Sequence, residues 1–408
     1  MSNRMERRVV LTGLGAVSAF GIGVDPLWGA LSEGRSAIGP LRHPYAKDLK
    51  ATIAAQLHDF RPEDHFDERV LPLLDRVSQF ALLAAREAAK QAGLPHGGDN
   101  SHRTAVIVGT GAGGETSRDE QDRKLYGEGA VRVHPLSIVR IMTSAPCSHI
   151  SMELGSTGPA FVVSSACASA NHAICQAVAL LRSGMADVAV TGGAEACLSF
   201  GVFRAWEAMR ILADDTCRPF CKQRHGLVLG EGAAMFVLET LEHARGRGAT
   251  ILAEIAGTGM SADAGDIVAP SAEGAARAIQ AALSDAGLSA SDIGYINAHG
   301  TGTQANDVTE TRAIHQVFGP RATEVPVSST KSMHGHALGA SGALELVAVV
   351  QALRNGILPP TANFLDPDPA CDLDVIRNEP RRVQVAAALS HSFAFGGLNA
   401  VLAVRAPD

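Results

Sequence analysis

Short apolar runs alternate with longer amphipathic segments along most of the chain. The clearest helix is predicted at 75–93, where Val77, Phe80 and Ala84 recur on one face and Gly93 stands at the position of a C-cap glycine. Other helices are predicted from Cys167 to Gly184, at 275–286 and 308–318, and as one long helix to Leu353. Strands are predicted at 8–12, 103–108, 187–191, 233–238, 251–255, 294–297, 325–328, 383–389 and 400–404. This alternation indicates an α/β fold with largely buried sheets.

Two segments of the chain repeat each other. Residues 163–167 read Val-Ser-Ser-Ala-Cys and residues 327–331 read Val-Ser-Ser-Thr-Lys, and each precedes an apolar helix that closes on Leu-Arg-x-Gly. Two similar halves would place Cys167 and Lys331 at matching strand-to-helix turns, facing one another across a shared centre. The repeat therefore favours an internally duplicated fold.

A charged stretch at 242–247, closed by Gly248, separates the two copies. Because the pattern of strands and helices restarts after it, we expect one half at 1–250 that carries Cys167, and a second half at 251–408 that carries the other polar clusters. With 408 residues, the chain is long enough for two or three domain-sized cores.

Cys167 is the candidate nucleophile. It follows a short β-branched run and lies near the start of a buried helix, where the helix dipole is expected to lower its pKa from about 8.5 toward neutrality. Its small neighbours leave room for a substrate beside the thiol. Taken alone, this stretch favours an inert core cysteine, because free cysteines are among the most buried residues, and it is the rest of the chain that favours the nucleophile.

Three further polar or glycine-rich clusters follow predicted strands. His299 opens a His-Gly-Thr-Gly-Thr segment, Lys331 opens a segment that contains His336, and Phe395 lies in a glycine loop between the last two strands. Ligands gather at such strand ends in α/β sheets. Individually, His299 could be a hydrogen-bonded core histidine, Lys331 a buried ion-pair partner and Phe395 a packing residue. Together with the cysteine they form the constellation expected of an active site.

Two other motifs point to different chemistry and are rejected. Residues 109–114 fit Gly-x-Gly-x-x-Gly, but a polar segment without an apolar helix face follows, and no second strand ends in an acid about twenty residues on. Cys217, Cys221 and His225 recur at four-residue intervals, but no fourth ligand is near and Pro219 interrupts a helical register. We therefore expect neither a dinucleotide site nor a metal site.

Composition narrows the class of protein. A net charge of −7 argues against general nucleic-acid binding, and an acidic partner would need a local basic patch. Seven cysteines without Cys-x-x-Cys pairs fit a reducing cytoplasm. The apolar run 9–24 follows several arginines, as in a signal peptide, but glycines interrupt it and Asp25 and Pro26 follow, so we expect a first strand and a glycine turn. No other apolar run reaches about 18 residues, so no membrane span is expected.

The combined motifs resemble those of the β-ketoacyl-acyl-carrier-protein synthases. They are Cys167 in Ser-Ala-Cys-Ala-Ser, His299 in Asn-Ala-His-Gly-Thr-Gly-Thr, Lys331 followed by His336, and Phe395 in Phe-Gly-Gly-x-Asn. The resemblance spans essentially the whole chain. The residues within the motifs are most similar to those of the nodulation protein E group and of type II polyene ketosynthases. It implies a thiolase-like fold with two pseudo-symmetric halves in an αβαβα five-layer arrangement. It also implies a homodimer, or a heterodimer with a homologous ketosynthase or chain-length factor.

The same resemblance implies a decarboxylative Claisen condensation. Cys167 would accept an acyl group from an acyl carrier protein, with the backbone N–H groups of Cys167 and Phe395 forming the oxyanion hole. Malonyl-carrier protein would then bind, and His299 and His336 would stabilise the enolate formed as CO₂ leaves. The product would be a fatty-acid-like, polyene or polyketide chain longer by two carbons. The family needs no metal or other cofactor for this chemistry.

The resemblance also implies supporting roles. Lys331 would organise the site electrostatically, with Glu310 as its partner. Thr301 and Thr303 would hydrogen-bond the pantetheine arm of the substrate, and Phe395 would gate the acyl pocket.

The chain departs from the family's pattern at several positions. Ala394 stands where many relatives have Gly, Leu398 where they have Thr, and His391 where Asn is common. Ala112 stands where relatives that handle medium-to-long saturated chains carry a larger aliphatic residue, so we expect it to deepen the acyl pocket. The apolar segment 71–74 lacks the basic residues with which fatty-acid relatives bind the acidic carrier protein, so other basic residues are expected to dock it. These are Arg132, Arg204, Arg210 and Lys222.

Two other functions fit parts of the pattern. A thiolase acting on acyl-CoA usually needs a second catalytic cysteine near its C-terminal glycine loop, and no cysteine follows Cys371. A non-catalytic or weakly catalytic chain-length-factor-like partner typically lacks the nucleophile, whereas Cys167, His299 and His336 are all present here. Both stay as alternatives to the condensing enzyme.

Overall fold

Five strands of the N-terminal half form the first part of the central sheet. The computed structural model describes residues 7–98 and 100–407. These strands lie in the order β6-β5-β7-β8-β1, with β5 parallel to β6 and β7 and the other neighbours antiparallel. Their bounds are β1 Val9–Ser18, β5 Thr104–Gly109, β6 Ala160–Val163, β7 Val188–Glu195 and β8 Gly232–Thr240.

Five strands of the C-terminal half repeat this arrangement. They lie in the order β11-β10-β15-β16-β9, with β10 parallel to β11 and β15 and the other neighbours antiparallel. Their bounds are β9 Ala253–Ala262, β10 Tyr295–Asn297, β11 Pro326–Ser328, β15 Ala387–Ala394 and β16 Leu398–Arg405. The edge strands β1 and β9 pair at residues 9–11 and 253–255, which joins both parts into one 12-stranded sheet. The duplicated α/β topology predicted from the repeated segments is therefore confirmed.

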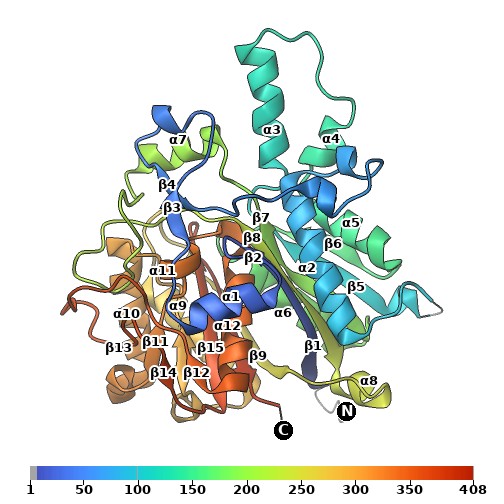
Figure 1. The fold of residues 1–408 in the computed structure, drawn as a ribbon. Helices are drawn as coiled ribbons and strands as arrows, with labels where there is room; N and C mark the ends of the chain where they lie inside the picture. Colours follow the sequence, from blue (N-terminus) through green and yellow to red (C-terminus); the bar gives the residue numbers. More distant parts are fainter. Residues whose placement is uncertain (1–6, 99, 408) are drawn as a thin grey trace.

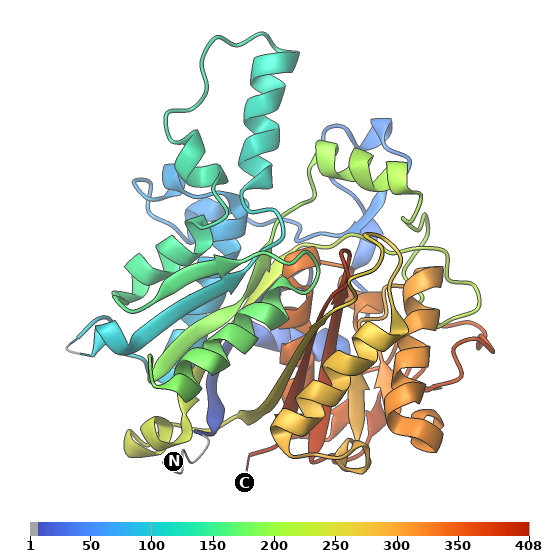
Figure 2. The ribbon, with the colours of Figure 1, turned by 180° about the vertical axis from the view of Figure 1, so that it is seen from behind.

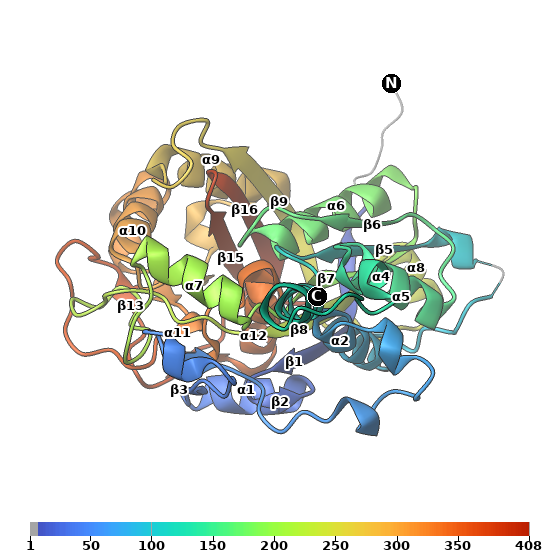
Figure 3. The same cartoon turned by 90° about the horizontal axis from the view of Figure 1, so that it is seen from above.

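Helices form three layers around the two parts of the sheet (Figures 1 and 2). Helices α2 and α5 cover the outer face of the N-terminal part, α9 and α10 cover the outer face of the C-terminal part, and α6 and α12 pack between the two parts. Their bounds are α2 Arg76–Ala92, α5 Ala145–Leu154, α6 Ser169–Ser183, α9 Ala272–Ala286, α10 Gln304–Phe318 and α12 Ser341–Asn355. Figure 3 shows the two halves side by side. The result is the αβαβα arrangement.

The best-predicted helix shows why these elements form. The Asp75 side chain caps α2 by accepting the Val77 N–H, and Gly93 ends the helix with a left-handed φ of 64°. On the neighbouring strand, a Cβ at Gly13 or Gly15 would lie 2.1 Å from a carbonyl oxygen of α2. Because these positions are glycine, α2 can pack closely against β1. The strand therefore continues through the glycines to Ser18, where we predicted a glycine turn.

One other expectation is wrong. The long helix predicted up to Leu353 is broken into α11 (Lys331–His334) and α12, because Gly335 takes a φ of 67° that other residues rarely adopt. The break brings His336 out of any helix. The polar segment after 109–114 forms a helix, α3 (Glu115–Asp122), which projects from the body of the protein in Figure 1.

The remaining elements are short and lie around this framework. They are β2 Gly21–Ile22, α1 Val24–Ser32, β3 Ile38–Pro40, β4 Ile53–Ala55, α4 Ser137–Ile141, α7 Phe200–Met209, α8 Leu241–Gly246, β12 Ile357–Leu358, β13 Asp374–Val375 and β14 Arg381–Arg382. Among the residues that the structure describes, no helix is both long and apolar enough to cross a bilayer.

Candidate active site

Cys167 lies in a tight turn between β6 and α6. The preceding residue, Ala166, has a φ of 49°, in the left-handed region, and α6 begins two residues after Cys167, at Ser169. The Ser169 hydroxyl donates to the Ala166 carbonyl (2.7 Å) and accepts the Ser165 N–H (2.9 Å), so one side chain holds the turn from both sides. The turn presents the Cys167 thiol at the end of the strand rather than in the helix.

His336 is the direct partner of the cysteine. Its Nε2 lies 3.1 Å from Cys167 Sγ, and its Nδ1 lies 2.8 Å from the Ser341 hydroxyl oxygen. The His336 backbone N–H donates to the Val228 carbonyl (2.7 Å), which fixes the residue in the gap between α11 and α12. A serine hydroxyl can accept or donate, so either tautomer of the His336 ring can be held.

His299 follows β10 and completes the pair of imidazoles. Its ring centroid lies 5.5 Å from that of His336, and the two planes are nearly perpendicular at 82°. The Glu310 carboxylate accepts the backbone N–H groups of His299 and Gly300 at 2.8 Å each. Glu310 therefore holds the loop that carries His299.

The partner of Lys331 is Glu345, and not Glu310 as we expected. The fully buried Lys331 ammonium makes an ion pair with the equally buried Glu345 carboxylate on α12. It also donates to the His299 carbonyl oxygen (2.6 Å) and lies 3.3 Å from His299 Nδ1. Because an ammonium only donates, His299 Nδ1 accepts and the ring proton stays on Nε2. Lys331 thus sets the tautomer of His299.

Burial keeps both histidines neutral. It lowers the pKa of His299 and of His336 well below the usual value for histidine, and the charge of Lys331 lowers both further. Burial also raises the pKa of Glu345 to about 7, although Lys331 opposes this shift. Near neutral pH the site therefore holds two uncharged imidazoles, which can donate or accept single protons.

The thiol of Cys167 does not have the lowered pKa that its place near a helix suggested. Only 6% of the residue is exposed, and burial raises its pKa to about 12 although the charge of Lys331 opposes the shift. Desolvation of the thiolate outweighs the attraction of nearby positive charge. The thiol is therefore the resting form, and the proton must leave as the sulfur reacts. His336 Nε2 is placed to take it.

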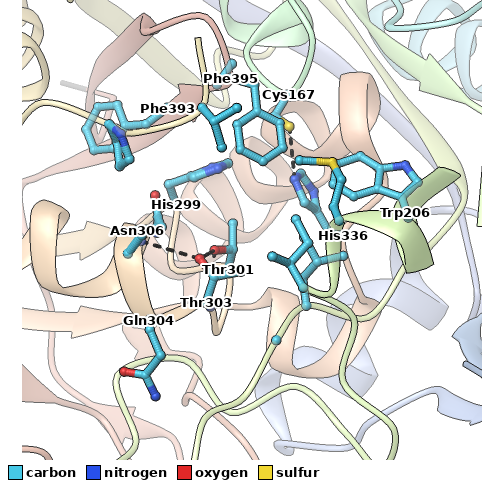
Figure 4. Close-up of a pocket in the computed structure, with 18 of the residues that line it drawn as sticks. Cys167, Trp206, His299, Thr301, Thr303, Gln304, Asn306, His336, Phe393 and Phe395 are labelled. Atoms are coloured by element: carbon cyan, nitrogen blue, oxygen red, sulfur yellow. Dashed lines mark hydrogen bonds between the residues drawn. The ribbon is translucent and has the colours of Figure 1, made fainter. Parts of the chain in front are cut away.

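Cys167, His299 and His336 line one cavity of about 360 Å³ (Figure 4). Phe395, Thr301 and Thr303 line it as well, so the structure brings together most of the residues singled out from the sequence. The Thr301 and Thr303 hydroxyls lie 2.9 Å apart. Other lining residues that the sequence did not single out as site residues include Trp206, Met209, Ile211, Gln304 and Asn306. One ligand atom each of Cys167, His299 and His336 lies within 4.8 Å of the other two. Zn²⁺ also accepts such a set of donors, but a bound zinc ion would occupy the sulfur that is needed as nucleophile.

Ala112 lies outside this cavity. Its backbone N–H donates to the buried Glu195 carboxylate (3.3 Å), which also accepts the N–H groups of Gly111 (2.7 Å) and Gly339 (3.0 Å). The glycine-rich segment 109–114 is therefore held by a carboxylate of the protein, an arrangement unlike that of a phosphate-binding loop. Through Glu195 it is tied to the segment that follows His336.

The four basic residues suggested for docking are all exposed, but only Arg210 lines the cavity. Arg204 is paired with Glu207 on the same helix at 3.0 Å. His225, which the sequence grouped with two cysteines, is hydrogen-bonded to Asp214 instead (2.9 Å).

Sequence reasoning missed two buried carboxylates. Glu345 is the single acid of the helix α12, whose first thirteen residues are all buried, and a lone charge in such a helix is a signal that a partner exists. Glu195 ends the fully buried strand β7 in the same way. What the one-dimensional pattern does not contain is the identity of each partner.

Comparisons with known proteins agree on one family. Residues 6–244 match the family model "Beta-ketoacyl synthase, N-terminal domain" and residues 252–365 match "Beta-ketoacyl synthase, C-terminal domain". The chain therefore belongs to the β-ketoacyl synthase family, whose members are condensing acyltransferases.

Individual relatives cover almost the whole chain. Nodulation protein E of Rhizobium sp. (strain N33) is 52% identical over 401 residues, 98% of this chain and 100% of that protein. The 3-oxoacyl-(acyl-carrier-protein) synthase 2 of Staphylococcus aureus (strain N315) is 38% identical over 407 residues, 98% of each chain. The solved ishigamide ketosynthase/chain length factor has a TM-score of 0.94 at 37% identity and covers 99% of this chain and 100% of that one. The resemblance and the thiolase-like fold predicted from the motifs are confirmed.

Proposed function

We propose that the protein is a 3-oxoacyl-acyl-carrier-protein synthase that extends an acyl chain, held on Cys167, by two carbons from malonyl-carrier protein. The observation that carries this is a buried thiol with a neutral imidazole at 3.1 Å and a second neutral imidazole beside it. The name of the synthase 2 supports the substrate class and the pairing with a carrier protein.

Acylation uses His336 as the proton carrier. The S–H proton of Cys167 passes to His336 Nε2 while the sulfur attacks the thioester carbonyl of the acyl-carrier protein. The backbone N–H groups of Cys167 and Phe395 receive the developing oxyanion. Collapse releases the carrier-protein thiolate, which takes the proton back from His336. The Ser341 hydroxyl at Nδ1 holds the tautomer whose Nε2 can accept.

Condensation uses the histidines as donors. When malonyl-carrier protein loses CO₂, the Nε2–H of His299, held by Lys331 at Nδ1, hydrogen-bonds the enolate oxygen, and His336 shares this role once Ser341 donates to its Nδ1. The enolate carbon attacks the acyl-Cys167 carbonyl, forming the new C–C bond and breaking the C–S bond. The Cys167 sulfur leaves as a thiolate and regains its proton from solvent, which restores the resting thiol.

His299→Ala and His336→Ala are expected to slow decarboxylation of malonyl-carrier protein by about a hundredfold or more, because each removes a donor to the enolate. The measurement is CO₂ release from radiolabelled malonyl-carrier protein. His315→Ala is the matched control, since His315 pairs with Asp372 on the outer surface of α10 and should keep full activity. Decarboxylation within threefold of wild type in both active-site variants would contradict the proposal.

Substrate recognition is assigned to the other lining residues. Thr301 and Thr303 bind the pantetheine arm within the cavity, and Phe395 gates the acyl pocket. Arg210, which is exposed and lines the cavity, binds the acidic carrier protein together with exposed Arg204. Reversing the charge of these arginines should raise the KM for the carrier protein. Two further docking residues are Lys222 and Arg132.

Although Ala112 lies outside the cavity that Cys167 lines, we propose that the end of a longer acyl chain reaches it, on the loop that Glu195 holds. Ala112→Ile is expected to shorten the longest product, because the added side chain fills space that the alkyl chain would occupy. Mass spectrometry of the products measures the change. Products of unchanged length, with unchanged turnover, would remove Ala112 from the pocket.

We further propose that residues 1–250 and 251–408 are the two halves that build this site, and that the enzyme works in the cytoplasm as a homodimer or with a homologous subunit. The repeated strand order supports the division. The name of the ketosynthase/chain length factor supports a paired assembly. The intact Cys167 and histidine set supports a catalytic subunit over a chain-length factor.

A further inference from the structure

Trp206 contacts the residue assigned as the gate. Its ring stacks on that of Phe395, with centroids 5.9 Å apart and planes at 29°. Both side chains line the cavity together with Cys167, and Figure 4 shows the two rings near the Cys167 sulfur and the His336 ring. A tryptophan that lines the cavity is thus in direct contact with the residue proposed to gate the acyl pocket.

Phe395 lies on a turn whose conformation depends on glycine. It stands at the tip of the hairpin between β15 and β16 and is followed by Gly396 and Gly397, both in the left-handed region with φ of 83° and 67°. Glycine takes such conformations at little cost and leaves them as easily. The tip is held by the Gly396 N–H, which donates to the Ile267 carbonyl (2.8 Å).

Trp206, in contrast, lies on a helix that hydrogen bonds and packing hold against the body of the protein. It belongs to α7, and the carboxylate of its neighbour Glu207 accepts the backbone N–H groups of Ala51 (2.9 Å) and Lys50. The helix also packs through Phe203 into a separate hydrophobic cluster next to β4. Stacking therefore joins a ring on a glycine turn to a ring on a helix that packs against the body of the protein.

We propose that Trp206 is a positioning residue that holds Phe395 in the closed position until an acyl group is transferred to Cys167. The inference rests on the proposed function. Opening the gate separates the rings, so the stacking energy adds to the free energy of opening and lowers the open population by about two- to tenfold. The same contact reseals the site before the enolate forms, which keeps water from protonating it to acetyl-carrier protein.

The first test uses Trp206 as its own reporter. The chain has two tryptophans, and Trp28→Phe removes the other one, which packs against the core on α1. Emission from Trp206 is followed during incubation with a series of acyl-carrier proteins from butyryl to palmitoyl, while intact mass follows the adduct on Cys167. Emission is expected to change in step with the adduct, and not in a Cys167→Ala background.

The outcomes of this test are separable. A full adduct on Cys167 without a change in emission overturns the gate role and leaves the proposed function standing. No adduct with any donor overturns the proposed function and this inference with it.

The second test measures coupling as CO₂ released per 3-oxoacyl product. In Trp206→Ala this ratio is expected to rise about two- to tenfold, because the gate stays open while the enolate exists. Trp206→Phe keeps a stacking ring and is expected to restore the wild-type ratio. Equal losses of CO₂ release and condensation in Trp206→Ala, with no change in their ratio, would show a merely structural role.

Discussion

Wild-type protein incubated with acyl-carrier proteins is expected to gain the mass of one acyl group, and Cys167→Ala is expected to gain none. Condensation should fall by at least about a thousandfold in the variant. The physical reason is that, in the described part of the chain, Cys167 alone among the cysteines hydrogen-bonds an imidazole. Because burial keeps the thiol protonated, nucleophilicity depends on that imidazole and not on a preformed thiolate.

Cys175→Ala is the matched control for this experiment. Cys175 lies on α6, just beyond Cys167, is also buried, and has a pKa that burial likewise raises to about 12. It lacks a histidine partner and does not line the cavity, so its loss should leave acylation intact. An adduct that persists in Cys167→Ala would place the nucleophile elsewhere. No adduct on the wild type with any donor would contradict the proposed function.

Lys331→Met is expected to destabilise the fold by about 3 kcal/mol, because it leaves the Glu345 carboxylate buried without its countercharge. Part of the cost is avoided by proton uptake, since the pKa of Glu345 is already raised to about 7 and Lys331 is the group that holds it down. A carboxyl whose folded-state pKa lies above its unfolded value stabilises the fold at low pH and loses that contribution as pH rises through the folded value. The free energy of unfolding in urea should therefore fall as the pH rises from about 4.5, the unfolded-state pKa of the carboxyl, through 7.

The double variant Lys331→Met with Glu345→Gln separates stability from catalysis. Removing the carboxylate should restore most of the free energy of unfolding and abolish the part of its pH dependence that Glu345 contributes. Condensation should stay about a hundredfold below wild type, because His299 Nδ1 has lost the donor that keeps the proton on Nε2. Recovery of activity together with stability would mean that Lys331 acts only as a structural ion-pair partner.

The sequence was informative where a residue's role depends on its own neighbours in the chain. The Cys167 turn, the His299 loop and the paired segments at 163–167 and 327–331 were found from local pattern, because strand ends, glycines and apolar periodicity are written in consecutive residues. The same is true of α2, whose cap residues Asp75 and Gly93 flank it in sequence.

The sequence did not reveal which residues far apart in the chain become partners, or how deeply each is buried. Lys331 was matched with Glu310, but a break at Gly335 turns the chain so that Glu345 on the next helix reaches it first. The pKa of Cys167 was expected to fall, but the cost of desolvation, which depends on everything packed around the thiol, raises it.

By itself, then, the sequence determined the family, the duplicated α/β topology and the residues that meet at the centre. Each of these follows from motifs and periodicities that a linear chain contains. Only the tertiary structure decided which carboxylate neutralises Lys331, which imidazole touches the thiol, and that Trp206 stacks on Phe395. Those facts depend on distances between segments far apart in sequence, and packing sets such distances.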